Sequence, residues 1–172
     1  SWRRPTMAKL KRWGRELLLL ALIALAVVTV MDWLNAPQAP PAFDAQTLTT
    51  LDGESVSLAQ LSHERPLLVY FWASWCGVCR FTTPDVARLQ AAGGNVLTVA
   101  LRSGDDAQVK HWLARKRLAL PVVNDPAGTL SAQWQIGVTP TFVVVSQGKV
   151  VQSTTGWTSY WGMKLRLWWA AQ

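Results

Sequence analysis

Cys76 and Cys79 are the only cysteines of the sequence, and their type and spacing predict covalent chemistry. Two intervening residues, Gly77-Val78, place the sulfurs one helical turn apart, near enough to form a disulfide. The pair follows an apolar run, Leu67–Trp72, typical of a strand buried on both faces, and precedes a stretch with helical periodicity. Cys76 therefore falls at a helix N-terminus, where unpaired N–H groups and the helix dipole stabilise a thiolate.

This placement predicts that Cys76 attacks a disulfide of a partner and that Cys79 resolves the mixed disulfide. A zinc site would need further ligands, and His63 and His111 lack finger-like spacing. Haem attachment would need histidine where Arg80 stands. A purely structural disulfide over so short a loop would stabilise little. Copper(I) binding by the two thiolates stays open. We expect the redox-active disulfide to act without a bound cofactor and without a metal.

Strands and helices alternate through the rest of the chain, which predicts an α/β sandwich with a mixed sheet. The last predicted helix, 158–170, is expected to turn Trp161, Leu165, Trp168 and Trp169 inward, as packing. The other predicted elements are a hairpin over 45–58 around Asp52-Gly53, strands at 95–101 and 122–123, helices at 105–117 and 130–135, and a hairpin of 141–145 with 150–154.

The N-terminal part has the charge order of a membrane anchor. Six of the 17 basic residues and two of the ten acidic residues lie within 1–34. Trp13 and Trp33 bracket the apolar run Leu17–Met31 at about 30 Å, the spacing of two aromatic belts. A cleaved signal peptide is the rival interpretation. The predicted divisions are a basic cytoplasmic head (1–16), a transmembrane anchor (17–34), a Pro- and Ala-rich linker (35–42) and an exported domain (43–172).

Three segments together resemble the thioredoxin superfamily. They are Phe71–Cys79 (Phe-Trp-Ala-Ser-Trp-Cys-Gly-Val-Cys), Gly137–Phe142 (Gly-Val-Thr-Pro-Thr-Phe) and the hairpin Leu51–Leu58. The last is similar to the added N-terminal hairpin of the membrane-anchored periplasmic branch, which includes thiol-disulfide proteins of cytochrome c maturation. Within it, the chain most resembles the membrane-tethered thioredoxin-like members of suppressor-of-copper-sensitivity systems. The resemblance implies a thioredoxin-like α/β fold, with a central mixed sheet flanked by helices.

The resemblance also implies a substrate groove beside the cysteines. In the family, the proline that matches Pro140 is cis and lies against the disulfide, and its neighbour, here Thr139, offers backbone groups to the substrate. Trp75, Gly77 and Val78 are predicted to complete the substrate-binding surface.

Two positions depart from the family pattern. Thioredoxins have a buried Asp six residues before the first cysteine, where this chain has Tyr70, and many anchored members have a Glu where it has Thr82. The usual proton acceptor for Cys79 is therefore missing. Water, Glu64 and the Tyr70 hydroxyl remain as alternatives.

Together these features predict a periplasmic thiol-disulfide oxidoreductase held in the inner membrane by a single helix and working in the reducing direction. The resemblance implies a transmembrane thiol donor as partner, besides protein thiols and disulfides. Nucleic-acid binding is not expected, because much of the positive charge lies in the N-terminal head. The alternatives are a copper(I)-binding module, a dithiol oxidase, and an interaction or chaperone module.

Overall fold

The computed structural model describes residues 3–172 and divides the chain into two compact units, 1–34 and 35–172.

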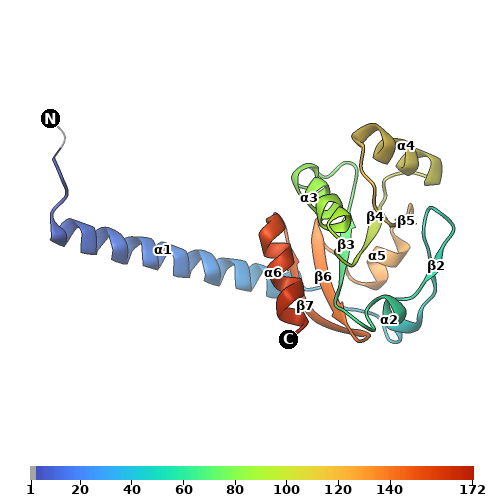
Figure 1. Ribbon diagram of the computed structural model, residues 1–172, viewed down its shortest axis with the longest axis horizontal. Coiled ribbons are helices and arrows are strands. Elements are labelled where there is room, and N and C mark those ends of the chain that lie inside the picture. The colour runs from blue at the N-terminus through green and yellow to red at the C-terminus, as the bar shows by residue number, and fades with distance from the viewer. Residues whose placement is uncertain (1–2) are drawn as a thin grey trace. The chain divides into compact units, whose positions relative to one another are not determined.

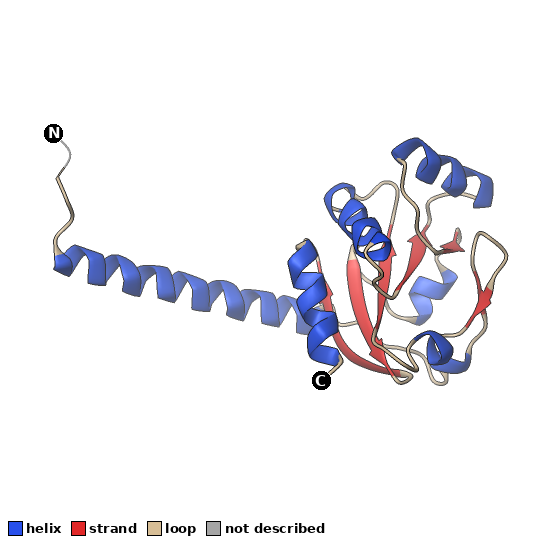
Figure 2. Cartoon of the chain, viewed as in Figure 1, coloured by secondary structure: helices blue, strands red, loops and turns tan. Residues whose placement is uncertain are grey.

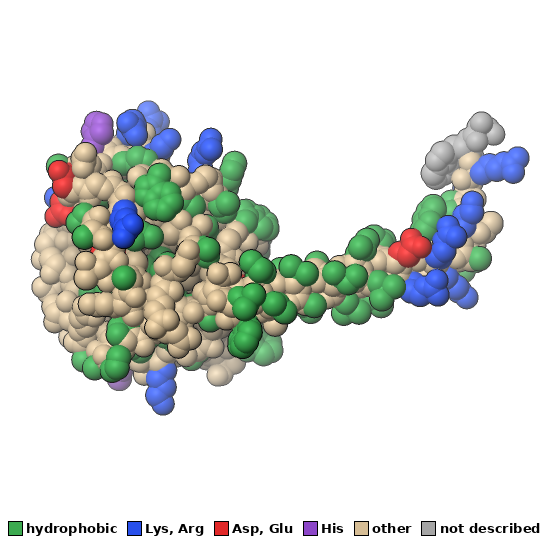
Figure 3. Space-filling model, turned by 180° about the vertical axis from the view of Figure 1, so that it is seen from behind, with side chains coloured by type: hydrophobic (Ala, Val, Ile, Leu, Met, Phe, Trp, Pro, Cys, Tyr) green, Lys and Arg blue, Asp and Glu red, His purple; other side chains and the backbone are tan. Residues whose placement is uncertain are grey.

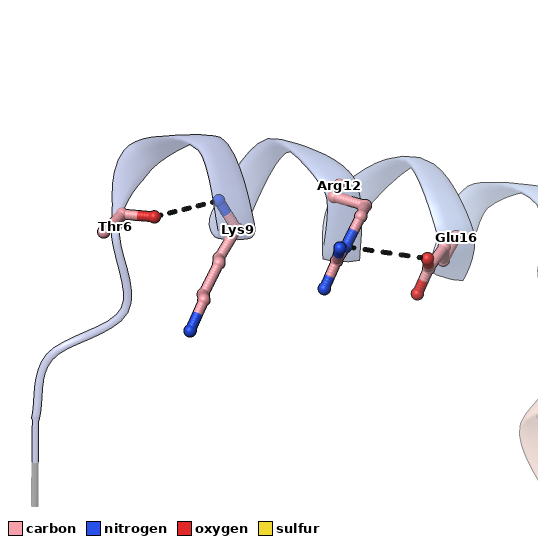
Figure 4. A network of polar contacts seen from close by, with 4 residues as sticks. All are labelled: Thr6, Lys9, Arg12 and Glu16. Atoms are coloured by element: carbon pink, nitrogen blue, oxygen red, sulfur yellow. Dashed lines mark hydrogen bonds and ion pairs between the residues drawn. The ribbon is translucent and has the colours of Figure 1, made fainter.

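The first unit is a single helix, α1 (Met7–Leu34), of 28 residues. Thr6 caps it: its Oγ1 accepts a hydrogen bond from the backbone N–H of Lys9 at 3.3 Å, and Arg12 pairs with Glu16 one turn further on at 3.9 Å (Figure 4). Hydrophobic side chains cover most of its length, and basic ones gather near its start (Figure 3). By length and composition α1 can cross a membrane, and a signal sequence would meet the same criteria.

The second unit is built on a mixed five-stranded sheet of order β5-β4-β3-β6-β7. The central strand β3 (Leu67–Trp72) runs parallel to β4 (Val96–Leu101) and antiparallel to β6 (Thr141–Ser146). The outer strands are β5 (Val122–Asp125), parallel to β4, and β7 (Lys149–Thr155), which forms a hairpin with β6. All six residues of β3 are buried, as its continuous apolar sequence predicts.

Helices cover both faces of this sheet (Figures 1 and 2). Alternate residues of β3 enter two separate cores: Tyr70 and Trp72 face one, Val69 and Phe71 the other. The Tyr70 side is covered by α3 (Cys79–Ala91), α4 (Asp106–Lys116) and α6 (Tyr160–Ala170), and the other side by η1 (Phe43–Ala45), α2 (Leu58–Leu61) and α5 (Thr129–Gln133). The predicted α/β sandwich is confirmed.

The N-terminal hairpin is present but shorter than predicted. Its strands are β1 (Leu48–Thr49) and β2 (Ser55–Val56), which pair antiparallel apart from the main sheet. The folded unit also starts earlier than the predicted boundary at residue 43. The backbone N–H of Gln38 donates to the carbonyl oxygen of Trp134 at 2.9 Å, and Ala39 packs against the core. At most three residues, 35–37, therefore separate α1 from Gln38.

The predicted orientation of the last helix is wrong. Its outer side chains are 58–70% exposed, and the core instead receives Tyr160 and Met163, with Leu167 and Ala170 partly buried. Both sets recur at helical spacing, so α6 has two apolar stripes and periodicity alone cannot select the buried one. The exposed stripe consists of Trp161, Leu165, Trp168 and Trp169.

Candidate active site

The loop after β3 carries the first cysteine and is held by three hydrogen bonds. The backbone N–H of Ser74 donates to the hydroxyl of Ser103 at 2.9 Å. The ring N–H of Trp75 donates to the carbonyl oxygen of Arg102 at 3.0 Å, which fixes an indole that is 62% exposed. The backbone N–H of Cys76 donates to Ala73 at 3.2 Å. The end of β3 and the segment after β4 thus position Cys76 together.

The two cysteines form a disulfide and differ in exposure. Cys79 is 2% exposed at the start of α3, whereas Cys76 is partly exposed. Regular helix begins at Cys79, three residues later than the sequence predicts, but the N–H of Cys79 still points to Cys76 Sγ at 3.2 Å. In the reduced protein this N–H would donate to a Cys76 thiolate. Accessibility and this hydrogen bond both favour Cys76 as the attacking sulfur.

The segment before β6 lies against the disulfide. Pairing of Phe71 with Thr141 brings the end of β3 and the start of β6 to the same edge of the sheet. The carbonyl oxygen of Thr139 is 3.4 Å from Cys76 Sγ, and the Thr139–Pro140 peptide bond is cis, as the resemblance implied. The hydroxyl of Thr141 donates to the carbonyl oxygen of Val138 at 2.7 Å and orders this turn.

A pocket of about 480 Å³ opens over the disulfide. The predicted residues Trp75, Gly77, Val78 and Thr139 line it together with Cys76, whereas Pro140 is buried and is not among its lining residues. Sequence reasoning missed three apolar residues of the wall. Two of them, Ile136 and Val138, lie beside the Thr-Pro pair in the chain and were within reach of a motif argument, but Leu101 comes from the end of β4. The three missed residues are Leu101, Ile136 and Val138.

The comparisons with known proteins agree with this geometry. Residues 36–159 match the Redoxin family. The chain belongs to the redoxin family. A thioredoxin-like protein of Haemophilus influenzae is 41% identical to this redoxin over 162 residues, covering 94% of the chain and 97% of the relative. The thiol:disulfide interchange protein HelX of Rhodobacter capsulatus is 27% identical, covering 83% and 88%. The crystal structure of StoA from Bacillus subtilis has a TM-score of 0.62 and 26% identity, covering 73% of this chain and 98% of that one.

The redoxin has a thioredoxin-like fold and is a thiol-disulfide oxidoreductase with a Cys-x-x-Cys pair. A cysteine disulfide is the redox group of such proteins. Within residues 3–172, no three His, Cys, Asp or Glu side chains are grouped so that they could hold a metal ion. Among these four residue types, a copper(I) role would therefore draw on the two thiolates without a third ligand.

A second pocket, of about 250 Å³, opens on the other side of Cys76. Arg80, Trp112 and Lys116 contribute to its wall, and the indole of Trp112 stacks on the buried Trp72 at 4.9 Å between ring centroids. Both cations are exposed, so solvent screens their effect on the sulfur. No sequence argument had connected α4 with the redox site.

The two departures from the family pattern bond to each other. The hydroxyl of Tyr70 lies 2.7 Å from the hydroxyls of both Thr82 and Thr83, beneath the first turns of α3. Burial raises the pKa of Tyr70 to about 12, while the two threonine hydrogen bonds act in the opposite direction. Tyr70 is therefore neutral at physiological pH. Neutral hydroxyls occupy the two positions where the resemblance to thioredoxins implied carboxylates.

These facts narrow the choice of proton acceptor for Cys79. A neutral Tyr70 with so high a pKa is a poor base at pH 7. Glu64 precedes the start of β3 whereas the cysteines follow its end, so the strand separates them by roughly 17 Å. Water, the remaining alternative, can reach the pair through the pockets beside Cys76.

Proposed function

We propose that this redoxin reduces disulfides of exported proteins while α1 anchors it in the inner membrane of a Gram-negative cell. Cys76 is the nucleophile, Cys79 is the resolving cysteine, and the groove of Thr139, Val138 and Trp75 receives the substrate chain. The carbonyl oxygen of Thr139, 3.4 Å from Cys76 Sγ, is placed to accept a backbone N–H of an extended peptide once the substrate sulfur approaches.

The reaction is two successive thiol–disulfide exchanges. The Cys76 thiolate attacks one sulfur of the substrate disulfide, forms a mixed disulfide and releases the other sulfur as a thiolate. The Cys79 thiolate then attacks Cys76 Sγ, which releases the second substrate sulfur and closes the Cys76–Cys79 disulfide. Two electrons pass from the cysteine pair to the substrate, and water takes up the proton of Cys79.

One observation supports the reducing direction: the surroundings of Cys76 Sγ stabilise a thiolate only modestly. Among the described residues, its polar contacts are the N–H of Cys79 at 3.2 Å and the carbonyl oxygen of Thr139 at 3.4 Å. The first favours a thiolate and the second disfavours it, and the cations Arg80 and Lys116 are solvent-screened. A strong oxidant would need a reduced form that is strongly stabilised, so these contacts favour a reductant.

Continued reduction needs a source of electrons. A membrane-embedded dithiol protein suits this role, because the exported side of the membrane is oxidising and soluble thiol pools are on the cytoplasmic side. In the N-terminal part, basic residues precede the apolar stretch. This order supports an anchor whose basic end stays in the cytoplasm.

The redox state of Cys76 and Cys79 in growing cells tests the direction. Acid quenching followed by alkylation of free thiols, on the full chain at its native level, should find the pair mostly reduced. A Cys79→Ser variant should accumulate mixed disulfides with substrates, and the matched Cys76→Ser variant should not. A mostly oxidised pair would contradict the reducing direction and favour a dithiol oxidase.

The anchor is tested separately by the mass of the mature chain and by its retention in alkali-washed membranes. Retention of the uncleaved chain is expected. A chain shortened after α1 and released to the soluble fraction would contradict the anchor but would leave the redox chemistry intact.

A further inference from the structure

The outer side of α6 is an exposed aromatic surface far richer in tryptophan than the folded unit needs for packing. We define the α6 surface as Trp161, Leu165, Trp168 and Trp169, which are 68%, 59%, 58% and 70% exposed. On the opposite side of the same helix, Met163 is 1% exposed. Large contiguous apolar patches on a protein surface generally mark an interaction site.

The patch continues onto the neighbouring edge strand. Val151 of β7 is 50% exposed and shares a shallow pocket with Leu165 and Trp169 of α6. Just before the helix, Trp157 is 65% exposed. No residue of α6 lines either pocket beside Cys76. A partner bound to the α6 surface would thus leave both pockets beside the disulfide accessible.

The charged side chains in and after β7 are all positive. Residues 126–172 contain no Asp or Glu, and the basic side chains Lys149, Lys164 and Arg166 lie among them. The ammonium group of Lys164 lies 5.3 Å from the ring centroid of Trp161, so a cation and an aromatic ring are presented together. Tryptophan beside lysine and arginine is the composition of segments that lie in the headgroup region of a bilayer. Such a surface complements anionic phospholipids.

The chain keeps a bilayer within reach if α1 spans it. Leu34 ends α1 and Gln38 is hydrogen-bonded to the domain, so the connection between these two residues measures at most about 14 Å when extended. A domain of this size has a radius of gyration of about 14 Å, so a connection of this length keeps the domain next to the bilayer. The short connection makes the effective concentration of lipid at α6 high.

From these observations we infer that the α6 surface binds the headgroup region of the bilayer that holds α1, with anionic phospholipids as ligand. This inference rests on the proposed anchor and deepens it: the domain lies on the membrane by α6 and presents Cys76 away from the residues that contact lipid. Trp161, Trp168 and Trp169 enter the interface, and Lys164 contacts lipid phosphates.

Quenching of tryptophan fluorescence by brominated phospholipids tests the inference on the full chain, reconstituted in phosphatidylethanolamine–phosphatidylglycerol vesicles. A variant with Trp161→Ser, Trp168→Ser and Trp169→Ser lacks the emission of the α6 tryptophans, and Trp75→Ser, the matched control, lacks the emission of Trp75. The brominated lipids should quench the α6 emission, obtained by difference, several-fold more than the Trp75 emission. Trp75 is 62% exposed, comparable to the α6 tryptophans, but lies beside the disulfide. A Lys164→Glu variant, which keeps all tryptophans, should lose quenching in anionic vesicles and not in zwitterionic ones.

Three outcomes overturn the inference. Equal quenching of the α6 and Trp75 contributions means that α6 faces water. If the α6 tryptophans become buried as the protein concentration rises, and brominated lipids do not quench them, a second copy covers them. Burial that requires another protein of the native membrane means a protein partner. In each case flotation of the chain with the vesicles still reports α1 insertion, so failure of α6 docking is distinguished from failure of the anchor. Retained disulfide reduction shows that the α6 variants are folded.

Discussion

The redox end of the domain and the α6 surface both expose tryptophan, but they hold it differently. At the redox end, the ring N–H of Trp75 donates to Arg102 and fixes the indole beside Cys76. Within residues 3–172, no ring N–H of Trp161, Trp168 or Trp169 has a hydrogen-bond partner in the protein. A fixed ring suits one bound peptide in one orientation, whereas free indole N–H groups suit a wet, variable interface. The comparison separates a preorganised site from a non-specific surface.

Loss of the attacking sulfur should have the largest effect on the redox end. Cys76→Ser is expected to abolish disulfide reduction, because the buried Cys79 cannot reach a protein disulfide. Cys79→Ser should permit the first exchange and stop at the mixed disulfide. Turnover of a disulfide-containing peptide and mass spectrometry of the adducts measure both. Residual turnover in Cys76→Ser would show that Cys79 is accessible and that the assigned roles are reversed.

The sequence predicted the redox end much better than the α6 surface, for a physical reason. The placement of Cys76 follows from one buried strand and one helix that are adjacent in the chain, and the Thr-Pro segment is attached to the strand that pairs with it. Local signals therefore determined most of the site. The second pocket and the α6 orientation depend on packing between distant segments. Trp112 reaches the site through its stacking on Trp72, and α6 could bury either of two apolar stripes. No local pattern carries that information.

At the redox end, the buried hydroxyls of Tyr70, Thr82 and Thr83 form a cluster without a carboxylate, and the ionisation of Tyr70 can test it. The pKa of Tyr70 is about 12 in the folded chain and 10 as its ordinary value, so the unfolded chain loses this proton first. Stability should therefore decrease as pH rises from 10 to 12, by roughly 2–3 kcal/mol relative to a Tyr70→Phe variant. Urea unfolding at pH 9 and at pH 11.5 measures the difference.

Tyr160→Phe, at the other tyrosine of the chain, is the matched control for general alkaline effects. If Tyr70→Phe and the parent chain lose stability equally between the two pH values, Tyr70 is not held neutral by burial.

Trp75 sharpens the comparison between the two tryptophan environments. Trp75→Ala should lower kcat/KM for a peptide disulfide about tenfold, or about 1.4 kcal/mol, because the fixed ring forms part of the groove beside Cys76. Trp161→Ala, which removes an indole of similar exposure, should leave kcat/KM unchanged for a soluble peptide. Steady-state rates of the two variants, measured side by side, decide this. Equal losses would mean that α6 also contacts the peptide.

The smallest effect is expected at Trp168, and its smallness is informative. Its side chain is 58% exposed, so Trp168→Ser should change the free energy of unfolding in neutral detergent by less than about 0.5 kcal/mol. The equilibrium with glutathione should not move, because Trp168 lines neither pocket beside Cys76. Met163→Ser, five residues away on the buried stripe, should instead cost several kcal/mol by the loss of core packing. If both variants lost stability alike, Trp168 would belong to the core, and α6 would have no aromatic surface left to offer a membrane.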